Sequence, residues 1–83
     1  MKLYHISQEE NNDYDTYSDL VVAAESEEEA RMIHPASYSE DPWKDQSPYG
    51  SWCKTPDQVD VEYIGEAASG IEKGIICASF HAG

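Results

Sequence analysis

The sequence predicts a small α+β fold, in which one antiparallel β-sheet carries a single short helix on one face. Four segments have the alternating or β-branched composition of strands, and one segment has the start and stop signals of a helix. Their order along the chain is β-β-α-β-β. With 83 residues, the chain is expected to form a single domain over residues 1–83.

The first two strands are expected at residues 2–7 and 17–24. The first segment alternates polar and apolar side chains, and the second is rich in β-branched and aromatic residues. Residues 8–16 between them are acids and turn formers, which are typical of an exposed connection. The simplest pairing of the two strands is a β-hairpin.

The helix is expected over residues 27–33. Ser26 and Glu29 have the spacing of a capping box, in which the serine hydroxyl accepts the N3 amide and the glutamate reaches back to the N-cap amide. Glu27, Glu28 and Glu29 fill the first turn, where the helix dipole favours carboxylates. Pro35 disfavours α geometry at the residue before it and so ends the helix.

The last two strands are expected at residues 58–64 and 75–80, joined by a loop over residues 65–74. The first of them alternates cleanly, and the second reads as a more buried strand. The alternation turns Val59, Val61 and Tyr63 inward and Asp60 and Glu62 outward.

A long irregular segment rich in proline and aromatic residues is expected at about 35–57. Loops of this length are uncommon in compact domains unless they are functional or disordered, and the aromatic content argues against simple disorder. The segment contains Pro35, Tyr38, Pro42, Trp43, Pro48, Tyr49, Trp52 and Pro56.

The charge is strongly negative: 17 Asp and Glu against 5 Lys and Arg give a net charge of −12. Five scattered cations cannot form a basic patch, which excludes binding to nucleic-acid phosphates or to an anionic membrane surface. No apolar run approaches the length of a membrane span. The acids either steer a basic partner towards the protein or serve solubility, and composition alone leaves both interpretations open.

The two cysteines, Cys53 and Cys77, lack a Cys-x-x-Cys spacing and follow no secretory signal. This pattern favours reduced thiols and a cytoplasmic protein in the host cell.

No catalytic or cofactor-binding motif is present, so we expect no enzyme activity and no cofactor. Asp13 and Asp15 have the spacing of the start of a calcium loop, but the glycine of that loop is missing. A lowered pKa of the Cys53 thiol has weak support from one neighbouring lysine. A metal site would require histidines and cysteines whose spacing matches no zinc motif, namely His5, His34, His81, Cys53 and Cys77.

Candidate partner-binding residues are aromatic anchors and their acidic neighbours, because tryptophan and tyrosine bury large rigid surfaces at interfaces. For Trp43 and Trp52 an alternative stays open, in which they complete a core that is short of large side chains. The candidates in the long segment are Tyr38, Glu40, Asp41, Trp43, Asp45, Tyr49 and Trp52. Acids at the hairpin tip and helix start add Asp13, Asp15, Glu27 and Glu28.

Four stretches of the chain resemble small acidic uncharacterised proteins of phages and prophages. These stretches are the opening Met-Lys-Leu-Tyr-x-Ile-Ser-Gln and residues 21–35, 61–67 and 74–83, which leave out the 36–57 segment. The strand that runs into Ala-Glu-Ser and a charged helix is also similar to anti-CRISPR and other anti-defence proteins. Neither resemblance carries a functional residue to this chain.

The resemblance and the charge together predict a non-enzymatic inhibitor that binds a bacterial nucleic-acid-handling defence protein. Its carboxylates would mimic nucleic-acid phosphates, and a CRISPR complex, a restriction enzyme or another defence nuclease would be the partner. Two alternatives stay open: a small structural or regulatory phage protein whose acidity serves solubility only, and a metal-binding or redox module. Oligomeric state is not predicted.

Overall fold

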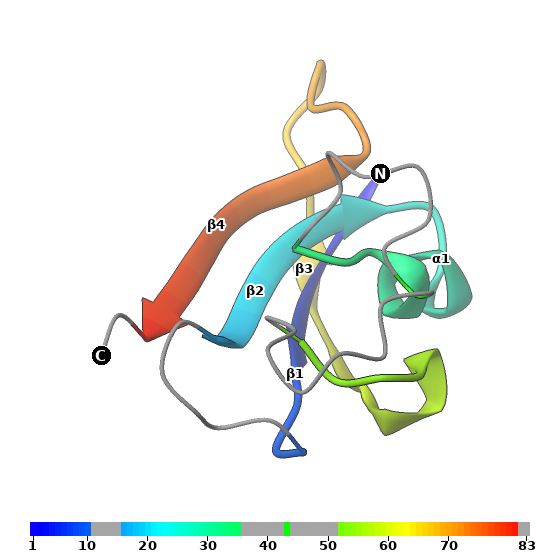
Figure 1. The fold of residues 1–83 in the computed structure, drawn as a ribbon. Coiled ribbons are helices and arrows are strands. Elements are labelled where there is room, and N and C mark those ends of the chain that lie inside the picture. Colours follow the sequence, from blue (N-terminus) through cyan, green and yellow to red (C-terminus); the bar gives the residue numbers. More distant parts are fainter. Residues whose placement is uncertain (11–15, 36–42, 44–51, 82–83) are drawn as a thin grey trace.

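The computed structural model describes residues 1–10, 16–35, 43 and 52–81. They form a four-stranded antiparallel sheet in the order β3-β1-β2-β4, with one short α-helix packed on it, which confirms the expected α+β fold (Figure 1). The strands are β1 (Lys2–Ser7), β2 (Thr16–Ala24), β3 (Asp60–Glu66) and β4 (Gly74–His81). The helix is α1 (Glu27–Met32), and a 3₁₀ turn, η2 (Pro56–Gln58), precedes β3.

The hairpin of β1 and β2 forms the centre of the sheet, as expected. Its register places Tyr4 opposite Val22 and Ile6 opposite Leu20, so these four side chains share one face. All four are buried in the core together with Ala30 of α1. Helix α1 therefore covers this face, and it contacts β1, β2 and β3 (Figure 1).

Helix α1 begins as the sequence predicts and ends one residue earlier. The Ser26 hydroxyl accepts a hydrogen bond from the Glu29 amide at 3.2 Å, which confirms Ser26 as the N-cap. The return bond differs from a standard capping box, because Glu29 accepts from the Glu25 amide at 3.3 Å instead of the Ser26 amide. Ile33 is already extended, although its amide still closes the last turn on the Ala30 carbonyl.

The segment from Trp52 to Val59 completes the core, although most of it falls in the irregular segment expected at about 35–57. Trp52 is 2% exposed, and Cys53 and Val59 are buried beside it in the same cluster. The Arg31 guanidinium of α1 donates to the carbonyls of Pro56 and Val59, and thus ties this segment to the helix.

Strand β3 begins at Asp60, two residues later than predicted, because the turn η2 takes up Pro56–Gln58. Of the three residues expected to face inward, Val59 is buried and Val61 packs on the core. Tyr63 remains 54% exposed, although its ring packs edge-on against Tyr4.

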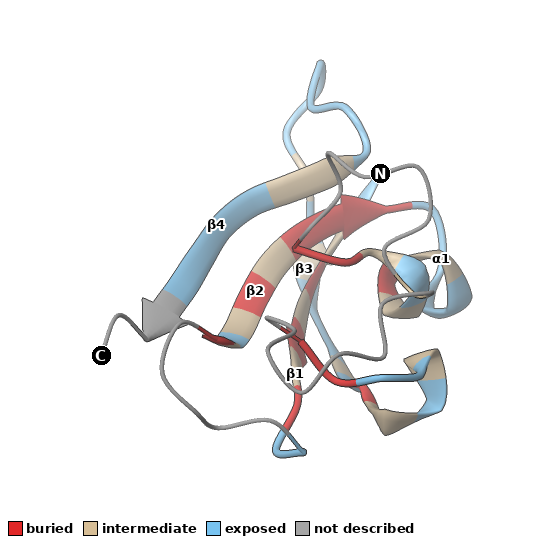
Figure 2. Ribbon diagram, in the orientation of Figure 1, coloured by how far each residue is buried: buried red, intermediate tan, exposed pale blue. Residues whose placement is uncertain are grey.

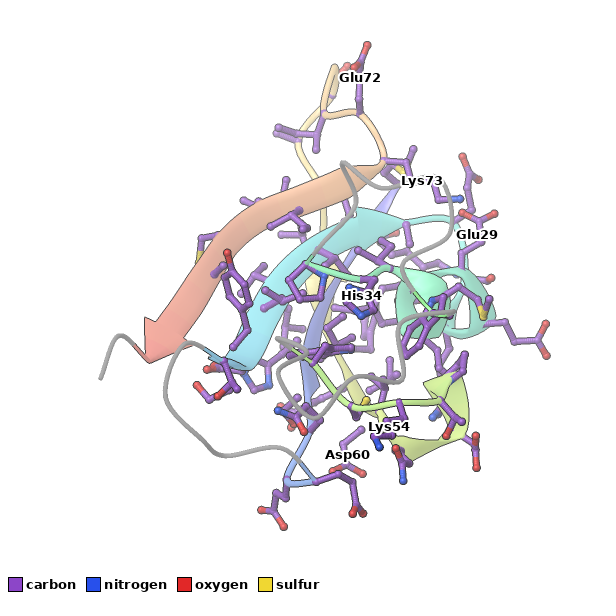
Figure 3. All side chains as sticks on the ribbon, viewed as in Figure 1. Glu29, His34, Lys54, Asp60, Glu72 and Lys73 are labelled. Carbon is purple, nitrogen blue, oxygen red and sulfur yellow. The ribbon has the colours of Figure 1, made fainter. Side chains whose placement is uncertain are left out.

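Both outer strands carry a β-bulge. The register leaves Ile64 as the extra residue in β3 and Ile76 as the extra residue in β4. Gly65 follows the first bulge with φ of 151°, a conformation that side chains with a Cβ rarely adopt. The loop from 67 to 73 links the two opposite edges of the sheet, and Lys73 pairs with Glu29 at 3.4 Å (Figure 3).

We predict that Ser26→Ala lowers the free energy of unfolding by about 0.5–2 kcal/mol, since it leaves the Glu29 amide without its hydroxyl acceptor. The measurement is urea unfolding followed by circular dichroism. Ser69→Ala, in the exposed β3–β4 loop, is the matched control and should unfold like the wild type. An unchanged midpoint for Ser26→Ala would mean that packing alone holds the helix start.

Candidate interaction face

The sheet face opposite α1 carries both polar and apolar side chains, and we call it the open face. The strand registers assign to it Leu3, His5 and Ser7 of β1, Asp19, Val21 and Ala23 of β2, Asp60 and Glu62 of β3, and Cys77 and Ser79 of β4. Apart from Ala23, which is buried, these residues are exposed or half-exposed, whereas Tyr4 and Ile6 on the helix-facing side of β1 are buried (Figure 2).

Three carboxylates are gathered on the open face. Asp60 and Asp19 flank Ser7 from the two neighbouring strands, so their Cα atoms lie about two strand spacings, or roughly 10 Å, apart. Glu62 lies opposite His5 and two residues along β3 from Asp60, which separates their Cα atoms by roughly 6.6 Å. The edge strand β3 and the central strand β2 thus hold three negative charges at spacings set by the sheet.

Asp19 is held by a hydrogen bond to His5. The distance from Nε2 of His5 to Oδ2 of Asp19 is 2.8 Å, and both side chains are half-exposed. The Ser18 hydroxyl donates to the other carboxylate oxygen at 2.7 Å. These bonds, the one with His5 foremost, hold the pKa of Asp19 below its ordinary value of 3.8, so this carboxylate is ionised at neutral pH.

The carboxylates of Asp60 and Glu62 have no such partner. Within the part of the chain that the structure describes, neither residue forms a hydrogen bond or an ion pair with a side chain. Asp60 is the first residue of β3, and both acids are exposed. These two acids are therefore available to an external cation.

The two tryptophans of the long segment lie against the core. Trp52 has almost no exposed surface, so the core alternative holds for this residue and its assignment as an interface anchor is wrong. Trp43 is half-buried: its indole nitrogen donates to the Met32 carbonyl at 3.0 Å, and its ring meets His34 edge-on at 4.8 Å. Its packing beneath α1 leaves only part of the ring for a partner.

The remaining sequence-predicted residues fall into two groups. Glu27 and Glu28 are exposed in the first turn of α1 and do not belong to the open face. The others lie outside the described residues, namely Asp13, Asp15, Tyr38, Glu40, Asp41, Asp45 and Tyr49.

The thiols do not support the redox alternative. Burial raises the pKa of Cys53 to about 11, which overturns the idea of a lowered pKa beside Lys54. Cys77 is exposed on β4, and both thiols are free. Among residues 1–10, 16–35, 43 and 52–81, no three His, Cys, Asp or Glu side chains are close enough to hold a metal ion.

The sequence does not predict the open face as a site, because the residues that form it are far apart along the chain. The alternation over residues 58–64 does turn Asp60 and Glu62 outward, and that was the available signal. What alternation cannot supply is the strand order, which brings Asp19 and His5 beside them.

Comparison of the chain with protein-family models, with curated proteins and with solved structures finds no match. The helix found in the described part of the chain is too short and too polar to cross a membrane.

We predict that Asp19 stabilises the fold above about pH 4 and loses this effect in acid. A carboxyl whose pKa is lowered by folding stabilises the native state above its unfolded pKa, and the effect disappears as the pH falls through the folded pKa. The urea midpoint of Asp19→Asn should therefore lie below that of the wild type at about pH 5, and the two should converge towards about pH 2. A difference that stays constant over this range would show that the carboxylate charge is not the source.

Proposed function

We propose that this protein is a non-enzymatic, phage-type inhibitor that binds a basic nucleic-acid-binding surface on a bacterial defence protein through its open face. The observation that carries the proposal is the set of three carboxylates, Asp19, Asp60 and Glu62, which are exposed or half-exposed on the sheet face opposite α1. The choice of partner class follows the resemblance to small phage proteins that is drawn from the sequence, and it is part of the proposal.

The charge of the whole chain supports association with a cationic surface. A net charge of −12 on 83 residues creates a negative field that raises the rate of encounter with a basic partner. The same field repels nucleic acid, so the partner is the protein that binds nucleic acid and not the nucleic acid itself.

The sheet supports mimicry of a phosphate backbone because it fixes its charges in space. Side chains on adjacent strands keep a constant spacing, and β1 and β2 at the centre are paired on both sides. A rigid array loses less conformational entropy on binding than carboxylates on a flexible loop. The partner would place arginine or lysine side chains against Asp60 and Glu62, whose oxygens have no partner among the described residues.

The alternative, acidity that serves solubility only, is favoured by acids that lie away from the open face. Glu28 is exposed on α1, and Glu72 is exposed on the β3–β4 loop (Figure 3 shows Glu72), so neither forms part of the array. If solubility were the whole role, any two exposed acids would be interchangeable. That equivalence is testable.

The test is phage plaquing on a panel of bacterial strains, each with one CRISPR or restriction system and each expressing this protein. We expect the wild type to restore plaquing in at least one strain, and Asp60→Asn/Glu62→Gln to lose most of that effect. The matched control, Glu28→Gln/Glu72→Gln, changes the net charge equally but leaves the open face intact, so it should inhibit like the wild type.

Two outcomes would contradict the proposal. Failure of the wild type to restore plaquing in every strain would exclude inhibition of these defence systems. Equal loss or equal retention of inhibition in the two double variants would exclude the open face as the binding site. Expression level and circular dichroism of each variant control for folding.

A further inference from the structure

Strand β4 is an edge strand without a single charged side chain. It lies at the end of the sheet order, and no described strand runs along its outer side (Figure 1). Its sequence, Gly-Ile-Ile-Cys-Ala-Ser-Phe-His, contains no Asp, Glu, Lys or Arg. Ile76 is 48% exposed, and Cys77, Ala78 and Ser79 are exposed as well (Figure 2).

The opposite edge of the sheet is protected in the usual way. Strand β3 carries three carboxylates, Asp60, Glu62 and Glu66, and charged side chains on an edge discourage a further strand from pairing there. The two edges share a bulged isoleucine, Ile64 on β3 and Ile76 on β4, with nearly equal exposure of 47% and 48%. The two edges differ in charge. On the uncharged edge at β4, the outward-facing backbone donors and acceptors can pair with a further strand.

We propose that two copies of this chain associate by antiparallel pairing of β4 with β4, which joins their sheets into one. The net charge of the chain favours a second copy as the strand that pairs with β4. A second copy also carries −12, so it can approach only where neither copy presents acids, and β4 is the uncharged strand of the described sheet. A basic peptide strand would instead be attracted to the acidic edge at β3.

The spacing of the nearest acid on the open face agrees with this choice. Asp19 is on β2, so in the pair the two Asp19 Cα atoms are separated by at least three strand spacings, roughly 14 Å. This exceeds the Debye length of about 8 Å at physiological salt, so the repulsion is largely screened. Pairing of β3 with β3 would place carboxylates on adjacent strands, roughly 5 Å apart.

Symmetry restricts the register. A two-fold axis perpendicular to the sheet leaves each residue on the same face in both copies. Residues that lie directly opposite in an antiparallel pair also share a face. The axis must therefore pass midway between one residue and the same residue of the second copy. Near the middle of β4 these pairs are Cys77 opposite Cys77 or Ala78 opposite Ala78. The two Cys77 side chains are then directly opposite or diagonal neighbours, with Cα atoms within about 8 Å.

The first experiment is sedimentation velocity over a range of protein concentrations at low and at physiological salt. We expect a concentration-dependent dimer that is stronger at the higher salt, because salt screens the repulsion between two acidic copies. Ile76→Lys should be monomeric under the conditions in which the wild type is dimeric. Ile64→Lys, with the same charge change at the matched position of the β3 edge, should dimerise like the wild type.

The second experiment uses Cys77 of the wild-type edge strand and introduces no charge there. A short bifunctional maleimide added to the folded protein should produce a covalent dimer that Cys77→Ser abolishes, whereas Cys53, which is buried, should remain unmodified. A wild type that stays monomeric at all concentrations and salt levels, or equal disruption by the two lysine variants, would overturn the proposal. So would a dimer that cross-links without Cys77.

This pairing is independent of the proposed function. Self-association through β4 strengthens with salt, whereas binding of a basic partner to the open face weakens with salt. Ile76→Lys therefore tests the β4 dimer, and Asp60→Asn/Glu62→Gln tests binding through the open face. Either proposal can be refuted while the other stands.

Discussion

The helix-facing side of the sheet has more apolar surface than α1 can cover, and this mismatch governs the rest of the fold. The helix has six residues and buries one of them, Ala30. Tyr4, Ile6, Leu20 and Val22 would remain partly exposed beneath it, so Trp52, Cys53 and Val59 close the core from another segment. Arg31 holds that segment in place through two backbone carbonyls. A domain of 83 residues buries little apolar surface and is only marginally stable. The buried surface of Trp52 is therefore used for the core.

Local patterns were sufficient for the elements but not for what packs between them. Alternation and β-branched composition locate all four strands to within two residues, although β4 is largely exposed and not the more buried strand expected. Ser26 fixes the helix start because a cap is a contact between near neighbours. The role of Trp52 depended on how much surface the helix left uncovered, which no local pattern encodes. The bulges at Ile64 and Ile76 likewise follow from the pairing of strands that are distant in the sequence.

The two faces of the sheet have different roles. One face forms the core, and the other holds Asp19, Asp60 and Glu62 near one another, with His5 hydrogen-bonded to Asp19. Like charges in fixed positions raise the free energy of the folded state. Carboxylates that served the fold would be paired, as Asp19 is, whereas Asp60 and Glu62 have no partner among the described residues. Unpaired acids on a rigid face are consistent with a role in binding.

Unfolding of the Asp60→Asn/Glu62→Gln variant in urea is the most direct measurement of whether these two acids serve binding and not the fold. If they do, the variant is at least as stable as the wild type at low ionic strength, because two repelling charges have been removed. Its advantage should shrink as salt screens the remaining acids. A variant that unfolds at clearly lower urea than the wild type would show that Asp60 and Glu62 hold the sheet together, and would contradict their assignment to an interaction face.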